Sequence, residues 1–357
     1  MPQINVLDPG LKFPQNLRVT LGLDRRFFRG VIGAVDFVYT RAVHELYFTD
    51  VNLGPPIAAE AGEGGRPLYG TVSNATGIAT PARRVVTLGP VIRVSNRSSD
   101  RAYSISARLE RRFDGGALLG AAYAHSSALD LMSPVNFVAR ANLNNAPLDG
   151  TLEDRRLGTS SFDTPHRLTV IAILPLPLRS WVSLLYSGAS PPPFTYIVDG
   201  DVNADGIGAG QLKNDAVYVP RGRNDIQLQN PAAYDTLDAY INSEPCLQEN
   251  RGRILPRNSC RPGWFGTLNA RLTKTVPVRA GQSLEIGVDV FNVLNLIHRA
   301  WGQYRFTTLD PSVSLLKLVG YDPVYQRGVY RLELPPRNQV LDPASRWQAQ
   351  LGVRYVF

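Results

Sequence analysis

The chain has 357 residues, of which 44% are hydrophobic, and its formal net charge is +8. No segment approaches the roughly 18 consecutive apolar residues that a membrane-spanning helix requires, so the sequence excludes a helical membrane protein. The basic balance points first to nucleic-acid binding. However, most arginines alternate with apolar residues inside candidate strands, and no basic run is visible, so we expect no nucleic-acid partner.

Apolar and polar residues alternate at every second position in segments that recur along the chain, which is the period of a β-strand. Segment 16–25 shows this pattern first, and segment 31–48 follows after a short link. Asp114-Gly115, a strong hairpin signal, joins the next two segments. Nine main strands are expected, over residues 16–25, 31–48, 102–112, 117–128, 166–175, 181–198, 264–274, 283–293 and 346–357.

Short and long links alternate strictly between these strands. The long connections are residues 49–101, 129–165, 199–263 and 294–345. An antiparallel sheet with all tight turns at one end and all long loops at the other produces this order, as in outer-membrane barrels. The expected strands are also longer than the roughly 5–6 residues usual in soluble proteins. The pattern predicts an all-β fold, an antiparallel transmembrane β-barrel whose odd strand count fits an open or partial barrel.

Charged residues fall on the strand face opposite the apolar stripe. An arginine or lysine facing lipid at mid-membrane costs roughly 2–4 kcal/mol, so a single polar face favours a water-filled or plugged lumen. Trp181, Trp264, Trp347 and Tyr103 lie near strand ends, where an interfacial aromatic girdle belongs. A soluble β-sandwich also alternates, but it needs neither such long strands nor sorted loops. The charged residues are Arg18, Asp24, Asp36, Arg108, Glu110, Arg271, Glu285, Asp289 and Arg354.

In the final expected strand, apolar residues occupy every second position without interruption, and the strand ends on an aromatic residue. Its apolar face includes Trp347, Leu351, Val353, Tyr355 and Phe357. This resembles the C-terminal signal strand of bacterial outer-membrane barrels, which the barrel assembly machinery reads. The alternative is an ordinary half-buried strand that ends a soluble domain.

Several motifs resemble TonB-dependent outer-membrane receptors. Residues 104–116 resemble the hairpin of these receptors that has an Arg-Arg-Phe sequence before its turn. Residues 162–168 (FDTPHRL) resemble the start of one of their strands, and residues 289–295 (DVFNVLN) resemble their penultimate strand. Residues 200–206 (GDVNADG), together with Val219-Pro220-Arg221 and Asn258-Ser259-Cys260-Arg261, resemble the Oar-like branch, whose members carry a carboxypeptidase-regulatory-like domain before the plug.

The resemblance implies a receptor in the bacterial outer membrane. Such receptors close 22 strands around a plug, whereas this sequence shows neither plug, TonB-contacting segment nor signal peptide. We therefore expect residues 1–357 to be the C-terminal part of a barrel that supplies wall and solute-capturing extracellular loops. Implied partners are membrane lipid, the assembly machinery, TonB through the missing N-terminal part, and a solute of unknown identity. The alternative is a structural or adhesive outer-membrane protein without transport activity.

Acidic residues near 199–215 have the spacing of a calcium loop. Asp201, Asn203 and Asp205 precede a glycine, and Asp215 is a late candidate ligand. The usual glutamate at the twelfth position is replaced by Leu212. The alternative is a turn rich in Asp and Asn at a strand end. No other cofactor is predicted.

Cys246 and Cys260 lie 14 residues apart, a spacing that permits a disulfide in an oxidising compartment. Closing a loop of this size stabilises a protein by about 3 kcal/mol in the entropy model. Ser161, Asp163 and His166 contain the residue types of a catalytic triad, but proximity in sequence does not make a relay. We therefore predict no enzyme activity.

Overall fold

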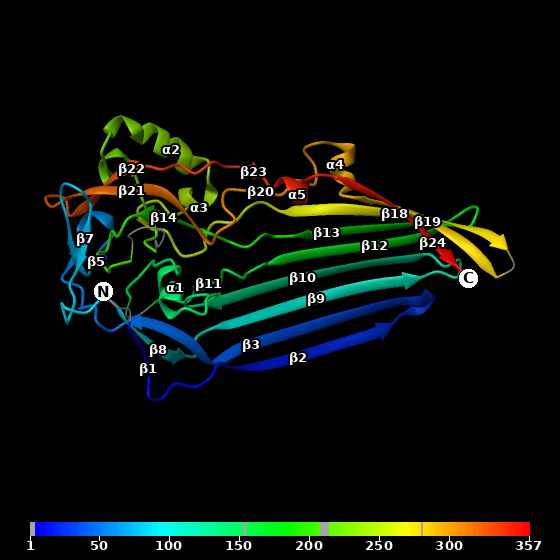
Figure 1. Cartoon of the computed structure of the whole chain (residues 1–357), viewed down its shortest axis with the longest axis horizontal. Helices are drawn as coiled ribbons and strands as arrows, with labels where there is room; N and C mark the ends of the chain where they lie inside the picture. Colours follow the sequence, from blue (N-terminus) through cyan, green and yellow to red (C-terminus); the bar gives the residue numbers. More distant parts are fainter. Residues whose placement is uncertain (1–3, 153–154, 208–213, 280) are drawn as a thin grey trace.

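A long antiparallel sheet and a folded head at one of its ends make up the molecule (Figure 1). The structure, a computed structural model, describes residues 4–152, 155–207, 214–279 and 281–357. The sheet is a single layer, and the head is built from the long connections between its strands. No helix among the described residues is long and apolar enough to cross a membrane.

Nine strands run through the sheet as an antiparallel meander, and each pairs with the next one along the chain. This confirms the predicted all-β fold. β2 and β24 are its two edges and do not pair with each other in the described part of the chain, so the sheet is open, as in a partial barrel. The strands are β2 Gln15–Arg26, β3 Val31–Asp50, β9 Arg101–Arg112, β10 Leu118–Asp130, β12 His166–Leu176, β13 Ser180–Ala189, β18 Phe265–Arg279, β19 Gln282–Phe291 and β24 Gln348–Val356.

One predicted strand, residues 181–198, is wrong. β13 ends at Ala189, and β14 (Thr195–Asp199) belongs to a different sheet in the head. Pro191, Pro192 and Pro193 lie between the two strands. Proline has no N–H to donate to a ladder, so three in succession end the pairing.

The cross-strand register keeps apolar side chains on one face. Leu23 lies opposite Val35, Val35 opposite Ala107, Ala107 opposite Tyr123, and Tyr123 opposite Leu168. The described residues form a single layer here and leave this face uncovered, so Leu23 is 69% exposed. The alternation predicted from sequence thus becomes a continuous apolar surface.

The other face carries the charges. Arg271 lies 3.5 Å from Asp289 and 3.9 Å from Glu285, and Arg354 lies 3.8 Å from Glu285. These contacts cross β18, β19 and β24 as a ladder of opposite charges. Trp181 is opposite Thr273, which puts it on this polar face rather than in an outward aromatic girdle.

The head contains most of the short elements and the hydrophobic core. Two buried clusters lie in it, one around Tyr196, Leu237 and Leu316 and the other around Tyr47 and Ile92. A four-stranded sheet in the order β14-β21-β22-β16 crosses the head, and β8 and β1 extend the loop end of β3. The remaining strands are β1 Ile4–Leu7, β4 Ala58–Glu60, β5 Arg66–Leu68, β6 Gly70–Val72, β7 Ala79–Pro81, β8 Val91–Arg97, β11 Gly158–Thr159, β15 Tyr218–Val219, β16 Gln227–Leu228, β17 Arg253–Ile254, β20 Arg305–Phe306, β21 Ser312–Asp322, β22 Arg327–Leu332 and β23 Gln339–Val340.

The α-helices among the described residues are short and lie outside the long strands of the sheet. Four of them, α1, α2, α3 and α5, lie in three of the long connections, and α4 directly follows β19. The tight turns lie at the opposite end of the sheet, where the C-terminus also lies (Figure 1). The helices are α1 Ala139–Asn144, α2 Tyr234–Asn242, α3 Pro245–Gln248, α4 Val293–Ile297 and α5 Asp342–Ser345.

Candidate functional site

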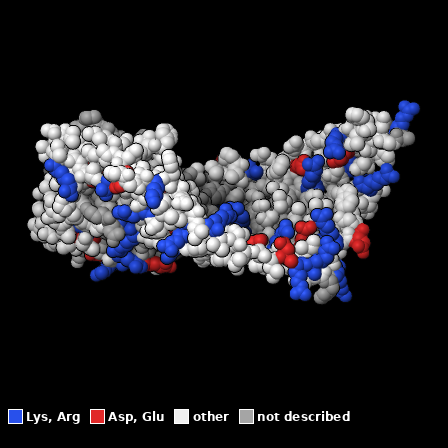
Figure 2. Space-filling view, turned by 90° about the horizontal axis from the view of Figure 1, so that it is seen from below, with Lys and Arg blue, Asp and Glu red and all other residues white. Residues whose placement is uncertain are grey.

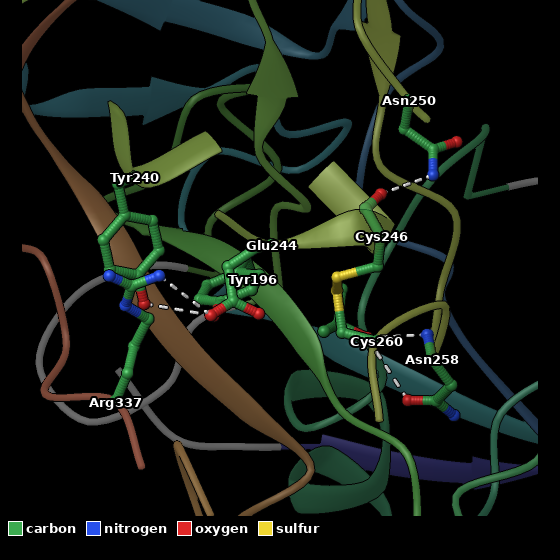
Figure 3. Close-up of a disulfide and its surroundings, with 9 residues drawn as sticks. Tyr196, Tyr240, Glu244, Cys246, Asn250, Asn258, Cys260 and Arg337 are labelled. Carbon is green, nitrogen blue, oxygen red and sulfur yellow. Dashed lines mark hydrogen bonds and ion pairs between the residues drawn. A yellow bond between two sulfur atoms is a disulfide. The ribbon is translucent and has the colours of Figure 1, made fainter. Parts of the chain in front are cut away.

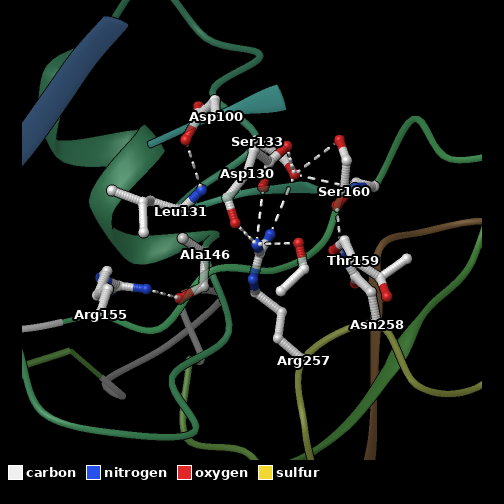
Figure 4. Close-up of polar contacts among 12 residues, drawn as sticks. Asp100, Asp130, Leu131, Ser133, Ala146, Arg155, Thr159, Ser160, Arg257 and Asn258 are labelled. Carbon is white, nitrogen blue, oxygen red and sulfur yellow. Dashed lines mark hydrogen bonds and ion pairs between the residues drawn. The ribbon is translucent and has the colours of Figure 1, made fainter. Parts of the chain in front are cut away.

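A buried ion pair joins two of the long connections in the head (Figure 4). Arg257 Nη2 lies 2.7 Å from Asp130 Oδ1 at the end of β10, and Arg257 Nη1 donates to Ser133 Oγ at 3.1 Å. Ser133 in turn donates to Asp130 Oδ2 at 2.6 Å. Because both carboxylate oxygens and the guanidinium are engaged, the burial of these charges is compensated.

Two neighbouring residues strengthen the same junction. Asn258 Nδ2 donates to the carbonyl of Thr159 at 2.7 Å, beside β10 and β11. Arg261 Nη2 lies 2.7 Å from Asp163 Oδ2, while Asp163 Oδ1 accepts the N–H of Ala128 at 2.8 Å. The sequence motifs around 162–168 and 258–261 therefore meet and fix one connection against another.

The side chains of Ser161, Asp163 and His166 each contact a different partner. Ser161 Oγ accepts from Asn258 Nδ2 at 3.1 Å, and Asp163 pairs with Arg261. His166 Nδ1 lies 2.7 Å from Tyr123 Oη on the apolar face of the sheet. The structure does not bring these three side chains into a relay.

A disulfide joins Cys246 and Cys260, which ties α3 to the segment that precedes β18 (Figure 3). Cys260 is buried and its backbone exchanges hydrogen bonds with Phe194. On the other side of α3, Arg337 lies 3.5 Å from Glu244 and over the ring of Tyr240. A covalent bond thus closes a loop in the C-terminal part of the longest connection.

The residues predicted to bind calcium lie together and are buried. Asp201 accepts the backbone N–H groups of Asp205 at 3.0 Å and Gly206 at 2.8 Å. Asp215 Oδ2 accepts the N–H of Val202 at 2.7 Å, which brings the late candidate onto the loop. Asn203 contacts Asp205 through its amide group. Leu212 lies outside the described residues.

This cluster has more negative charge than its surroundings compensate. Burial, followed by the charges of Asp205 and Asp215, raises the pKa of Asp201 well above its usual range. The buried Oδ1 atoms of Asn214 and Asp215 accept no hydrogen bond. Nevertheless, no group of three His, Cys, Asp or Glu side chains is arranged to hold a metal ion among the described residues. The turn network satisfies most of the oxygens, and calcium binding stays a prediction.

A second acidic group, which sequence reasoning missed, lies beside Asp215. Arg66 Nε lies 3.1 Å from Glu63 and 3.7 Å from Glu60, and Arg66 Nη1 lies 3.5 Å from Asp215. Burial is the main cause that raises the pKa of Glu60 to about 10, and the charge of Glu63 adds to it. Tyr330 donates to Glu63. Glu60, Glu63 and Arg66 are close in sequence, but Asp215 and Tyr330 come from distant segments, so no local pattern indicated the complete cluster.

Asn292 and Asn295 of the DVFNVLN motif connect β19 to the entry of β24. Asn292 Nδ2 donates to the carbonyls of Gly302 at 2.8 Å and Ser345 at 3.1 Å. Asn295 Nδ2 donates to Arg299 at 2.9 Å. Asn292 has a φ of 53°, a left-handed conformation that asparagine adopts more readily than most residues. The motif therefore ends one strand and positions the next.

The final strand presents the predicted signal residues outward. Leu351 and Val353 lie on the apolar face and are 70% and 63% exposed. Tyr355 Oη donates to Gln282 Oε1 at 2.7 Å and its ring stacks on Phe357. Trp347 precedes β24 at the loop end. Recognition of this strand by the assembly machinery stays a prediction.

Cavities lie between the connections in the head. One of 790 Å³ is lined by residues from three long connections, including Pro56, Asp149 and Arg253. Another, of 420 Å³, lies where β3 and β8 meet the loop of Asp205. Both lie within the size range of small-molecule sites, which is about 300–1,000 Å³. The head is therefore preformed around spaces that can hold a ligand.

The family model of the outer membrane beta barrel domain matches residues 1–303. No curated protein matches the chain. Solved structures that resemble it include the outer membrane transporter YddB from Escherichia coli, at 13% identity and a TM-score of 0.42, with 97% of this chain and 33% of that one covered. The FrpB iron transporter from Neisseria meningitidis has 9% identity and a TM-score of 0.41, with 99% and 33% covered.

A mutant of the ferric enterobactin receptor PfeA from Pseudomonas aeruginosa has 9% identity and a TM-score of 0.39, with 97% of this chain and 32% of that one covered. The chain thus spans about a third of the length of these structures. The family match covers most of the sequence and includes eight of the nine long strands. The chain therefore belongs to the outer membrane beta barrel domain family, and its sheet is barrel wall in the bacterial outer membrane.

Proposed function

We propose that the chain forms the wall and the solute-capturing loops of a TonB-dependent uptake receptor of the Oar-like branch. In this proposal the apolar face contacts lipid, the polar face lines the lumen, and the four long connections lie outside the cell. A plug and a TonB-contacting segment would be supplied by sequence outside residues 1–357. The barrel assembly machinery would read β24.

The observation that carries the proposal is the 790 Å³ cavity at the loop end of the sheet. Residues 56–67, 129–159 and 252–259 contribute to it, so it exists only when three connections fold together. A solute-capture site needs such a concave surface at the mouth of a barrel. Strand order alone would be equally compatible with a structural protein.

The contacts between connections support capture rather than a purely flexible surface. Arg257 with Asp130 and Arg261 with Asp163 fix the cavity walls, and the disulfide restrains the longest connection. A preformed site loses less conformational entropy on binding than a mobile loop does. These features favour specific recognition of one class of solute.

The orientation of the connections can be tested with surface labelling. An epitope inserted beside Phe137, which is fully exposed in the head, should be labelled on intact cells. The matched insertion at Asp114-Gly115, in a tight turn, should be labelled only after the outer membrane is opened. Labelling of the turn epitope alone on intact cells would refute the proposed orientation.

Transport can be tested in the bacterium that carries the gene. Cells with and without the gene should be compared for growth on limiting amounts of single nutrients, with and without a protonophore. If the chain is part of an uptake receptor, cells without the gene should grow poorly on one particular nutrient. Wild-type cells treated with the protonophore should show the same growth defect. Unchanged uptake together with lost surface attachment would support the structural or adhesive alternative instead.

A further inference from the structure

The 420 Å³ cavity is lined by three arginines that have no carboxylate partner. Arg84 lies between β7 and β8 in the 49–101 connection, and Arg93 and Arg97 lie on β8. All three side chains are exposed, and none makes an ion pair within the part of the chain that the structure describes. Most other arginines at the head junctions, such as Arg257, are paired.

The contacts that these arginines do make hold them in place without neutralising them. Arg84 Nε donates to the carbonyl of Leu53 at 3.0 Å. The guanidinium of Arg97 lies 4.7 Å from the centre of the Tyr47 ring, and Tyr47 is buried in the second core cluster. Stacking on an aromatic face leaves the N–H groups of a guanidinium free to bind an anion.

Nearby carboxylates are already engaged. Asp50, which also lines the cavity, pairs with Arg83 and accepts the N–H of Val91 at 3.0 Å. Asp205 accepts the N–H of Ile207 at 2.7 Å. Glu45, directly opposite Arg97 in the sheet, accepts the N–H of Leu46 at 2.9 Å. Among the lining residues, Asp205 is then the one carboxylate without an arginine partner, against three arginines, so the lining keeps a net positive charge.

Geometry indicates the number of anionic groups. Arg93 and Arg97 are four residues apart on one strand, so they share a face and their backbones are roughly 13 Å apart at about 3.3 Å per residue. If both side chains extend straight from the strand, their guanidinium groups are similarly far apart, so each can bind a separate anionic group. Figure 2 shows Lys and Arg gathered over the head in the view from below, with few acidic residues among them.

We propose that this cavity binds a small polyanion, a molecule with two or more carboxylate or phosphate groups. Guanidinium groups bind both kinds of group through paired N–H donors. The inference deepens the proposed function, on which its biological use rests, by naming the chemical class of the captured molecule. Binding itself requires neither TonB nor transport.

The test uses the full chain folded in detergent micelles at fixed salt, with calorimetric titration of citrate and of inorganic phosphate. The double variant R93Q/R97Q should bind citrate at least about tenfold more weakly, since each charge-assisted contact contributes about a factor of ten. The citrate affinity of R93K/R97K should lie between those of the wild type and R93Q/R97Q, because lysine keeps the positive charge but lacks the paired N–H donors. The matched control R305Q/R331Q removes two exposed arginines elsewhere in the head and should leave affinity within about twofold.

A further titration separates the two sources of such anions. Purified lipopolysaccharide is compared with its dephosphorylated form. In one outcome the wild type binds intact lipopolysaccharide but neither its dephosphorylated form nor citrate, and R93Q/R97Q does not bind intact lipopolysaccharide. This outcome supports the same anion chemistry, with a lipid headgroup as the source of the anion. Absence of binding to all probes, or equal binding by wild type and R93Q/R97Q, overturns the proposal.

Two readouts keep these outcomes interpretable. Circular dichroism and thermal melting show whether each variant folds like the wild type, and R93K/R97K provides a charge-conserving variant if the glutamine pair does not fold. Whole-cell uptake is measured separately. Retained citrate binding without uptake refutes transport only, whereas retained uptake without polyanion binding refutes this inference only.

Discussion

Arg257 and Asp130 are 127 residues apart in sequence and form a buried ion pair, with Nη2 2.7 Å from Oδ1. Asp130 ends β10, and Arg257 lies in the connection that leads to β18. The pair therefore joins two strands of the sheet that are not neighbours. It fixes two of the four long connections against each other.

Replacing Arg257 by Gln should destabilise the head by about 3–5 kcal/mol, because it leaves the Asp130 carboxylate buried without its partner. Limited proteolysis of the folded chain should show faster cleavage in the connections while the sheet stays protected. The double variant D130N/R257Q should lose less than the sum of the two single variants. R253Q, a matched change at an exposed position, serves as control, and equal cleavage of R257Q and R253Q would contradict the prediction.

Glu60 should make the head less stable as the pH rises. Its pKa is raised from 4.5 to about 10 by burial and by Glu63, so the folded state keeps a proton that the unfolded state loses above pH 4.5. Stability is therefore lost progressively between about pH 4.5 and 10. E60Q mimics the protonated form and should be more stable than wild type at pH 7, by on the order of 1 kcal/mol or more.

The measurement is the free energy of unfolding of wild type and E60Q from pH 5 to 9. The difference between them should grow with pH. A constant difference across this range would show that Glu60 does not titrate as its burial implies. E333Q, at a partly exposed position on the head, controls for the loss of one carboxylate.

Calcium should stabilise the head if Asp201, Asn203, Asp205 and Asp215 bind it. A ligand that binds only the folded state at 100 times its dissociation constant adds about 2.7 kcal/mol. The melting temperature of the chain in excess calcium should exceed that in a chelator, and D201N/D205N should remove the difference. Magnesium is the matched control cation. Identical melting in calcium and chelator would leave these residues as an Asp-rich turn.

The apolar face should not accept a charge at mid-strand. Ala107 lies between Val35 and Tyr123 near the middle of β9, and A107R should cost about 2–4 kcal/mol in a lipid bilayer. S106R places the same side chain on the polar face and should have a much smaller effect. The measurement is urea unfolding of the chain in lipid vesicles. Equal destabilisation by the two variants would contradict the assignment of the faces.

The sequence alone was sufficient for the long strands, because their period and length are local properties. Eight of the nine expected strands were found within a few residues of their bounds, and the exception contained Pro191 to Pro193. Antiparallel pairing followed from the short turns for four strand pairs, and from the strict alternation of short and long links for the other four. The faces were also predictable, since alternation determines which side chains share a surface.

Tertiary structure decided what the long connections do. The contact of Asp130 with Arg257 and the position of Glu60 beside Asp215 join segments far apart in sequence. The 420 Å³ cavity does the same, because its arginines share a lining with Leu143 and Asp205. No local period encodes such contacts, because irregular connections are fixed by packing and by the pairing of buried charges. The wall of this protein could thus be predicted from its residues in order, whereas the cavities in its head appear only once the connections fold together.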